Sequence, residues 1–237
     1  MTKIQTGRRV FTQLARPILA LITDFVYPPF CLLCDSRLQP TEQFVCSSCW
    51  KSLPQFATPF VKAQDLVLSQ HAYFNSSFAM YEYSEGLQKL IHIMKYSGMS
   101  HLAEKMGKEL AHVFCAQKAA IPIDIVTPVP LHPSRFRERG YNQAEILARK
   151  IASLSDLDIV HTLRRVRYTN QQAKYNRDQR IENVKDAFEL VKGLDLRGKN
   201  IAIVDDVQTT GSTMNECAKQ LRNVGAQEIL ALTITRI

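Results

Sequence analysis

Apolar positions along the chain predict alternating strands and helices from about residue 76 onward. Short apolar runs typical of strands lie at 78–83, 124–129, 200–204 and 229–234, with a shorter run after Asp158. Between them, apolar residues recur at helical spacing over 87–94, 102–113, 142–151 and 214–224. Asn142 and Glu145 resemble a capping box at the start of the third helix. This alternation predicts an α/β fold, with a mostly parallel sheet and helices on both faces.

The first sixty residues depart from this pattern, because prolines and two Cys-x-x-Cys pairs replace the periodic apolar positions. We therefore expect two domains, an N-terminal helix with a cysteine module over 1–60 and the α/β domain over 61–237. An apolar run at 17–26 is too short to cross a bilayer, contains Asp24 and lacks a small-residue cleavage site. We interpret it as an amphipathic lead-in that packs on the body of a cytoplasmic protein, one that is not an integral membrane protein.

The two cysteine pairs have the spacing of a Cys₄ zinc ribbon or knuckle: Cys31 and Cys34, then eleven residues, then Cys46 and Cys49. Each tight turn directs two thiolates at one tetrahedral ion, and structural zinc can fold a segment that has little core of its own. A redox role is the lesser alternative, because neither pair opens a thioredoxin-like unit. We therefore expect structural Zn²⁺ in a module that is either a stabilising appendage or a docking element.

The segment after the strand predicted at 200–204 carries the clearest chemistry: Asp205 and Asp206 come first, and a loop rich in Thr, Gly and Ser then opens a helix. N–H groups at a helix start are unpaired and attract anions, while carboxylates accept hydrogen bonds from vicinal hydroxyls. These features predict a ligand with a phosphate and a nearby diol, as in ribose 5-phosphate; an acidic pair that merely caps the helix is the alternative. The candidate ligand-binding residues of the loop are Val207, Gln208, Thr209, Thr210, Gly211, Ser212 and Thr213.

The string from Val204 to Thr213 (VDDVQTTGST) resembles the signature of type I phosphoribosyltransferases, which bind phosphoribosyl pyrophosphate. A second string runs from Pro128 to Ala144 (PVPLHPSRFRERGYNQA). Together with the cysteine pairs and the segment Leu90–Tyr96 (LIHIMKY), it resembles the ComF/GntX family of competence-associated, phosphoribosyltransferase-like proteins. The resemblance implies the type I phosphoribosyltransferase fold with a small N-terminal zinc-ribbon-like module. It also implies that a hood within residues 60–120 selects the acceptor, which the sequence does not identify.

By this resemblance, Pro128, Val129 and Pro130 form a pyrophosphate loop that continues toward Arg135, and Mg²⁺ bridges the pyrophosphate and the ribose hydroxyls. Residues 164–180 resemble the mobile catalytic lid of the superfamily. Lys95 matches a family position and is expected to turn inward as a further ligand-binding residue, although a lysine at a helix end also complements the helix dipole. The catalytic candidates are Asp205, Asp206, Arg135, Lys174, Arg177 and Arg180.

Charge suggests a polyanionic partner, because residues 135–180 hold 11 Lys and Arg against 5 Asp and Glu in a chain of net charge +8. Aromatic residues within this stretch could stack on bases beside phosphate-binding arginines; a solvated basic face is the bland alternative. The candidate nucleic-acid residues are Arg137, Arg139, Tyr141, Arg165 and Arg167.

The family's link to competence implies the handling of incoming single-stranded DNA at the cytoplasmic side of the inner membrane. Competence-machinery proteins and peripheral membrane association belong to that hypothesis. The alternative is an active phosphoribosyltransferase in nucleotide or small-metabolite salvage, with no DNA role.

Overall fold

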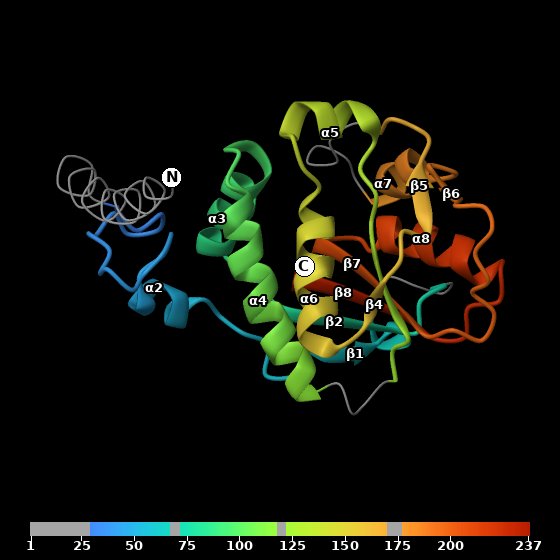
Figure 1. Cartoon of the computed structure of the whole chain (residues 1–237), viewed down its shortest axis with the longest axis horizontal. Coiled ribbons are helices and arrows are strands. Elements are labelled where there is room, and N and C mark those ends of the chain that lie inside the picture. Colours follow the sequence, from blue (N-terminus) through green and yellow to red (C-terminus); the bar gives the residue numbers. More distant parts are fainter. Residues whose placement is uncertain (1–28, 67–71, 118–121, 170–176) are drawn as a thin grey trace, which may run out of the picture. The chain divides into compact units, whose positions relative to one another are not determined.

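The computed structural model describes residues 29–66, 72–117, 122–169 and 177–237, and Figure 1 labels its elements. The lead-in predicted at 17–26 lies outside these residues, as does Lys174. The chain folds as two compact units, with the boundary between Ser52 and Leu53. Among the described residues, no helix combines the length and the apolar character needed to span a bilayer.

The larger unit is built on a six-stranded sheet in the order β1-β2-β8-β7-β3-β4. These strands are, in that order, Phe60–Lys62, Ser76–Glu82, Ile229–Arg236, Ile201–Gln208, Ile125–Pro128 and Asp158–Ile159. All neighbouring strands are parallel except β1, which pairs antiparallel with β2. The sequence prediction of a mostly parallel sheet is confirmed.

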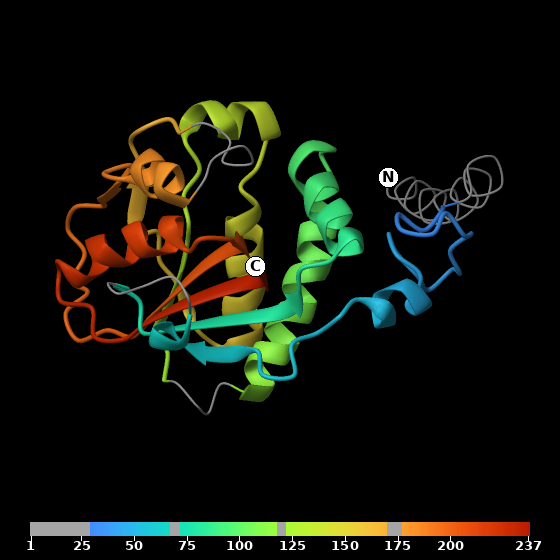
Figure 2. The ribbon, with the colours of Figure 1, turned by 180° about the vertical axis from the view of Figure 1, so that it is seen from behind.

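Helices cover both faces of this sheet. The helices α4 (Ser100–Gln117) and α6 (Gln143–Ser155) lie on the near side in Figure 1, and the reverse view in Figure 2 exposes β7 and β8 in front of α6. The two helices approach closely at Gly107, where an added Cβ would lie 3.3 Å from the Cα of Leu147. On the other face, α8 (Ser212–Arg222) packs Met214 and Leu221 into the core cluster that contains Ile201 and Ile203 of β7.

The remaining elements that the structure describes in the larger unit are three helices, a 3-10 turn and a second sheet of two strands. The helix α3 is Glu85–Tyr96, α5 is Pro133–Arg139 and α7 is Arg177–Val184; a 3-10 turn spans Ala63–Asp65. The strands β5 (Leu163–Arg165) and β6 (Phe188–Leu190) pair antiparallel. Helix α5 begins within the segment predicted as a pyrophosphate loop running toward Arg135, and the sequence pattern indicated no helix over 133–139. The helix was missed because it has no apolar face, although Pro133 at its start and Gly140 at its end are helix boundary residues.

The strand β7 continues through Asp205 and Asp206 to Gln208, four residues beyond the end predicted at 204. Its partner explains the difference, since β8 pairs with β7 as far as the register Gln208↔Arg236. The acidic pair therefore belongs to a central strand, close to its carboxyl end, rather than to the loop that follows.

The smaller unit has little apolar interior. It contains the short helix α2 (Ser47–Ser52) and two isolated bridges, Phe30↔Arg37 and Gln43↔Val45. Within the described residues up to Ser52, Cys31, Leu38 and Val45 are the buried hydrophobic side chains. A core of this size cannot hold the segment together without another source of stability.

Candidate functional site

A cavity of about 550 Å³ lies at the carboxyl ends of β3, β7 and β8. Ligands of open α/β sheets bind at this edge. The Lys, Arg and Asp side chains on its wall are Lys95, Arg135, Arg139, Arg165, Arg180, Asp205 and Asp206. The other predicted ligand-binding residues on the wall are Val129, Val207, Thr209 and Thr213. Five cationic side chains thus face two carboxylates, and the cavity is suited to an anion.

Asp205 and Asp206 reach this cavity from opposite faces of β7, because successive side chains of a strand alternate. The Asp206 carboxylate pairs with Lys95 of α3, at 2.9 Å between Oδ1 and Nζ. Asp205 Oδ1 accepts a hydrogen bond from the Asp206 N–H at 2.8 Å. Burial, and then the charge of Asp206, raise the pKa of Asp205 to about 7. The two neighbouring carboxylates therefore repel each other, and the ion pair with Lys95 offsets part of this repulsion.

The turn after β7 leads into α8 through Gly211, which has a left-handed φ of +70°. No side chain caps this helix start, so its first N–H groups are available to an anion. Thr209 and Thr213 face the cavity, while the hydroxyls of Thr210 and Ser212 bond to each other at 2.9 Å. Gln208 does not line the cavity: it is buried in the sheet and accepts a hydrogen bond from the Ser77 hydroxyl.

Helix α5 divides its arginines between two faces. Arg135 and Arg139, one turn apart, line the cavity, whereas Arg137 lines a second cavity of about 500 Å³ together with Pro128 and Pro130. The Arg135 guanidinium lies 5.2 Å from the ring centroid of Tyr168 and pairs with Glu138 at 2.9 Å. Arg135 and Arg139 are therefore placed to act on one ligand, whereas Arg137 faces a different cavity.

The segment predicted as the lid contributes Arg165 and Arg180 to the cavity wall. Arg165 lies over the Phe188 ring at 5.2 Å and donates to the Thr169 hydroxyl, and burial lowers the pKa of its guanidinium. Arg167 turns away and donates to main-chain carbonyls, those of Glu182 and Asn183 at 3.3 Å and that of Lys185. Arg177 begins α7, and its side chain is outside the described part of the structure.

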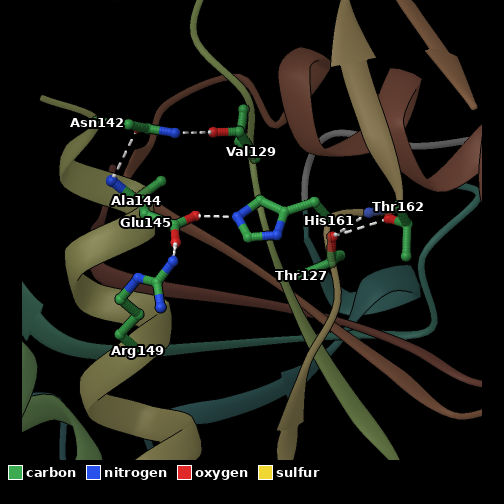
Figure 3. A network of polar contacts seen from close by, with 8 residues as sticks. All are labelled: Thr127, Val129, Asn142, Ala144, Glu145, Arg149, His161 and Thr162. Atoms are coloured by element: carbon green, nitrogen blue, oxygen red, sulfur yellow. Dashed lines mark hydrogen bonds and ion pairs between the residues drawn. The ribbon is translucent and has the colours of Figure 1, made fainter. Parts of the chain in front are cut away.

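The connection from β3 to α6 is held by the contacts in Figure 3. Asn142 donates to the Val129 carbonyl at 3.0 Å and accepts from the Ala144 N–H at 3.1 Å, which fixes the predicted pyrophosphate loop to the start of α6. Glu145 does not complete the expected capping box. Its carboxylate instead pairs with His161 at 2.6 Å and Arg149 at 2.5 Å (Figure 3).

Sequence reasoning missed the wall that α3 presents to the cavity. One stripe of this helix, spaced three or four residues apart, contributes Gln88, Ile91, His92, Lys95 and Tyr96. Only Lys95 of these was a candidate, although the helical spacing of the stripe is visible in the sequence. Other wall residues that were missed are Tyr83, Leu131, His132, Asn142, Gln143, Thr169 and Ile237.

Tyr141 was expected to contact nucleic acid, and its hydroxyl donates a hydrogen bond to the Met94 carbonyl of α3.

The four predicted zinc ligands converge in the smaller unit. The sulfur atoms of Cys31, Cys34, Cys46 and Cys49 all lie within 4.8 Å of one another. A tetrahedron with Zn–S bonds of about 2.3 Å has sulfur–sulfur edges of about 3.8 Å, and Cys34 Sγ lies 3.8 Å from Cys46 Sγ. The Cys46 N–H also points at Cys31 Sγ, at 3.3 Å. The cluster fits a structural zinc ion.

Two domain families match this chain. The phosphoribosyl transferase domain matches residues 138–236, and the double zinc ribbon domain matches residues 22–62. The fold and the two matches define a phosphoribosyltransferase-type domain preceded by a zinc ribbon module. A solved structure of adenine phosphoribosyltransferase aligns with 62% of this chain and 75% of that chain, at 16% identity and a TM-score of 0.37.

Curated relatives match over most of the chain. Competence protein F of Haemophilus influenzae is 28% identical, covering 87% of this chain and 96% of that protein. The DNA utilization protein YhgH of Escherichia coli K12 is 28% identical, covering 88% and 97%. Competence protein ComFC of Streptococcus pneumoniae is 26% identical, covering 87% of each. The chain is thus similar, over nearly its whole length, to competence proteins and DNA utilization proteins, in agreement with the resemblance seen in its motifs.

Proposed function

We propose that the cavity at the end of β7 binds phosphoribosyl pyrophosphate or a related ribose phosphate together with Mg²⁺. The observation that carries this proposal is the placement of Asp205 and Asp206 beside the uncapped start of α8, in one cavity. A phosphate fits the helix start, and a diol fits the carboxylates. Both needs are met by one ribose 5-phosphate.

The basic side chains of the cavity wall suit the pyrophosphate end of such a ligand. Arg135 and Arg139 of α5, with Arg165 of β5, face the cavity and suit a pyrophosphate group, since guanidinium groups make forked contacts with phosphate oxygens. The side chains of Asp205 and Asp206 offer carboxylate oxygens, the ligand type that Mg²⁺ prefers. When bound, Mg²⁺ would neutralise part of the pyrophosphate charge. Arg180 is a further candidate, and the roles of Lys174 and Arg177 stay predictions.

Transfer of the ribosyl group would need an acceptor opposite its C1. The part of the predicted hood that faces the cavity is the α3 wall with its exposed Tyr96, together with exposed Tyr83 just before the helix. An active phosphoribosyltransferase in salvage therefore remains the alternative to a binding role without transfer.

Calorimetric titration of the full chain with phosphoribosyl pyrophosphate and Mg²⁺ tests the binding proposal. We expect one saturable site per chain, and weaker binding of ribose 5-phosphate, which lacks the groups that face the arginines. Saturation by neither compound would overturn the proposal.

We also propose that the chain acts in natural competence, in the handling of incoming single-stranded DNA on the cytoplasmic side of the inner membrane. The support is the names of the relatives, competence proteins and DNA utilization proteins, over nearly their whole length. Within the chain, Arg139 and Arg165 face the ribose-phosphate cavity and Arg167 is engaged by carbonyls. The exposed residue best suited to a DNA backbone is therefore Arg137, beside Phe136, which is 50% exposed.

Single-stranded DNA binding is expected to weaken steeply as salt rises, because released counterions drive it. Arg137→Ala should reduce the slope of log affinity against log salt by about one. Gel-shift titrations at several salt concentrations measure this slope. Arg197→Ala, which removes an exposed arginine paired with Asp195 at 2.9 Å, serves as the control. A salt-independent affinity, or equal slopes for the wild type and Arg137→Ala, would argue against a DNA site on α5.

A further inference from the structure

Lys95 lies in the last turn of α3, but its ammonium group pairs with a residue of β7. A lysine in the last turn would ordinarily stay near the free carbonyls and complement the dipole. Here its ammonium group reaches Asp206 at 2.9 Å, with the two side chains only 24% and 7% exposed. The site therefore contains a built-in cation.

The residues on both sides of Lys95 make contacts with other parts of the chain. The Met94 carbonyl accepts a hydrogen bond from the Tyr141 hydroxyl. On the other side, the Tyr96 ring lies under the Arg139 guanidinium, 5.1 Å from its centroid, and the Tyr96 hydroxyl accepts from Arg139 at 3.4 Å. These contacts tie the last turn of α3 to the connection between α5 and α6. They restrict where the ammonium group of Lys95 can lie, unlike that of a surface lysine.

We propose that Lys95 is a tethered counter-cation of the acidic pair, which keeps free divalent cations away from Asp205 and Asp206 until a ribose-phosphate ligand brings one in. The proposal rests on the proposed function, because it concerns cation selection at the same site. With Lys95 present, its ammonium group pairs with Asp206, and a divalent ion that approaches the two carboxylates meets this positive charge. Without Lys95, no ammonium group opposes a divalent ion at the carboxylates, and their negative charge repels a phosphate more strongly.

Lys95→Met separates these effects, because it keeps the length and apolar stem of the side chain but removes the charge. With Mn²⁺ as the probe, electron paramagnetic resonance titration should show at least about tenfold tighter binding to Lys95→Met than to the wild type. In the absence of divalent ions, ribose 5-phosphate should bind Lys95→Met about tenfold more weakly than the wild type. Saturating Mg²⁺ should bring the affinity of Lys95→Met to within about twofold of the wild-type affinity measured at the same Mg²⁺ concentration.

Two further variants serve as controls. Lys95→Arg keeps the positive charge and should behave as the wild type in both titrations. Lys105→Met removes a lysine from a comparable ion pair, Lys105 with Glu109 at 2.8 Å on α4, and neither residue lines the cavity. It should leave Mn²⁺ and ribose 5-phosphate binding unchanged. Far-ultraviolet circular dichroism confirms that each variant is folded.

Equal Mn²⁺ affinity in the wild type and Lys95→Met would overturn the counter-cation role. A loss of ribose 5-phosphate binding that Mg²⁺ does not restore would also overturn it, since Lys95 would then contact the ligand directly. Tighter Mn²⁺ binding by Lys95→Met, with no ribose 5-phosphate binding by any variant, would support the counter-cation and reject the proposed ligand. The two proposals therefore fail separately.

Discussion

Replacing Asp205 and Asp206 together with asparagine is expected to lower the affinity for phosphoribosyl pyrophosphate by a factor of about 10² to 10⁴. Each hydrogen bond to a charged group is worth about 1.5–3 kcal/mol, and the pair would lose two of them, or about 3–6 kcal/mol. The asparagine amides keep the size of the side chains but lose the charge that attracts sugar hydroxyls and Mg²⁺. Calorimetric titration of the double variant, beside the wild type, measures the loss.

The folded state of this double variant should survive. Ionised Asp205 is destabilised by burial and by the charge of Asp206, which is why its pKa is raised to about 7. Removal of both charges ends that repulsion, although it also removes the ion pair with Lys95. Asp195→Asn is a matched control, because Asp195 is exposed, pairs with Arg197 and does not line the cavity. Undiminished binding by the double variant would show that the pair does not hold the ligand.

Replacing Cys31 with serine is expected to abolish zinc binding and to unfold the N-terminal unit. Apart from Cys31, the described part of this unit buries only Leu38 and Val45 among its hydrophobic side chains. Structural zinc contributes about 10–16 kcal/mol of apparent binding energy in modules of this kind, far more than two buried side chains supply. Metal analysis should find one zinc per wild-type chain and none in Cys31→Ser, and limited proteolysis should cleave the variant within residues 29–52.

Cys115→Ser is the control for the zinc experiment. Cys115 lies on α4 in the other unit, where its sulfur is 3.1 Å from the Ser155 hydroxyl, and it takes no part in the four-cysteine cluster. It should keep one zinc ion and the proteolytic pattern of the wild type. A zinc content near zero in freshly purified, reduced wild-type protein would refute the metal site.

The sequence was sufficient for most of the sheet and for the helices with an apolar stripe. Buried strands such as 200–204 and amphipathic helices such as 87–94 have periods that depend only on neighbouring residues. Helix α5 was missed because Arg135, Arg137 and Arg139 dominate it, and it has no apolar face to produce a period. The full length of β7 was missed because its last residues, from Asp205 onward, are held in the sheet by pairing with β8, which is distant in sequence.

The chemistry of the site was predictable in part. The acidic pair, the hydroxyl-rich turn and the four cysteines are local motifs, so the sequence names them. The partner of Asp206 is different, because Lys95 comes from a helix far away in the chain, and only the packing of α3 brings them to 2.9 Å. The division of the α5 arginines likewise needed the helix to be known, since its period sends Arg137 to the face opposite Arg135 and Arg139.

A crystal structure of the chain with phosphoribosyl pyrophosphate and Mg²⁺ tests the central claim most directly. The account predicts the 5′-phosphate on the N–H groups that follow Gly211, and the ribose hydroxyls on the carboxylates of Asp205 and Asp206. A ligand seated elsewhere, with those carboxylates free of any sugar contact, would contradict it.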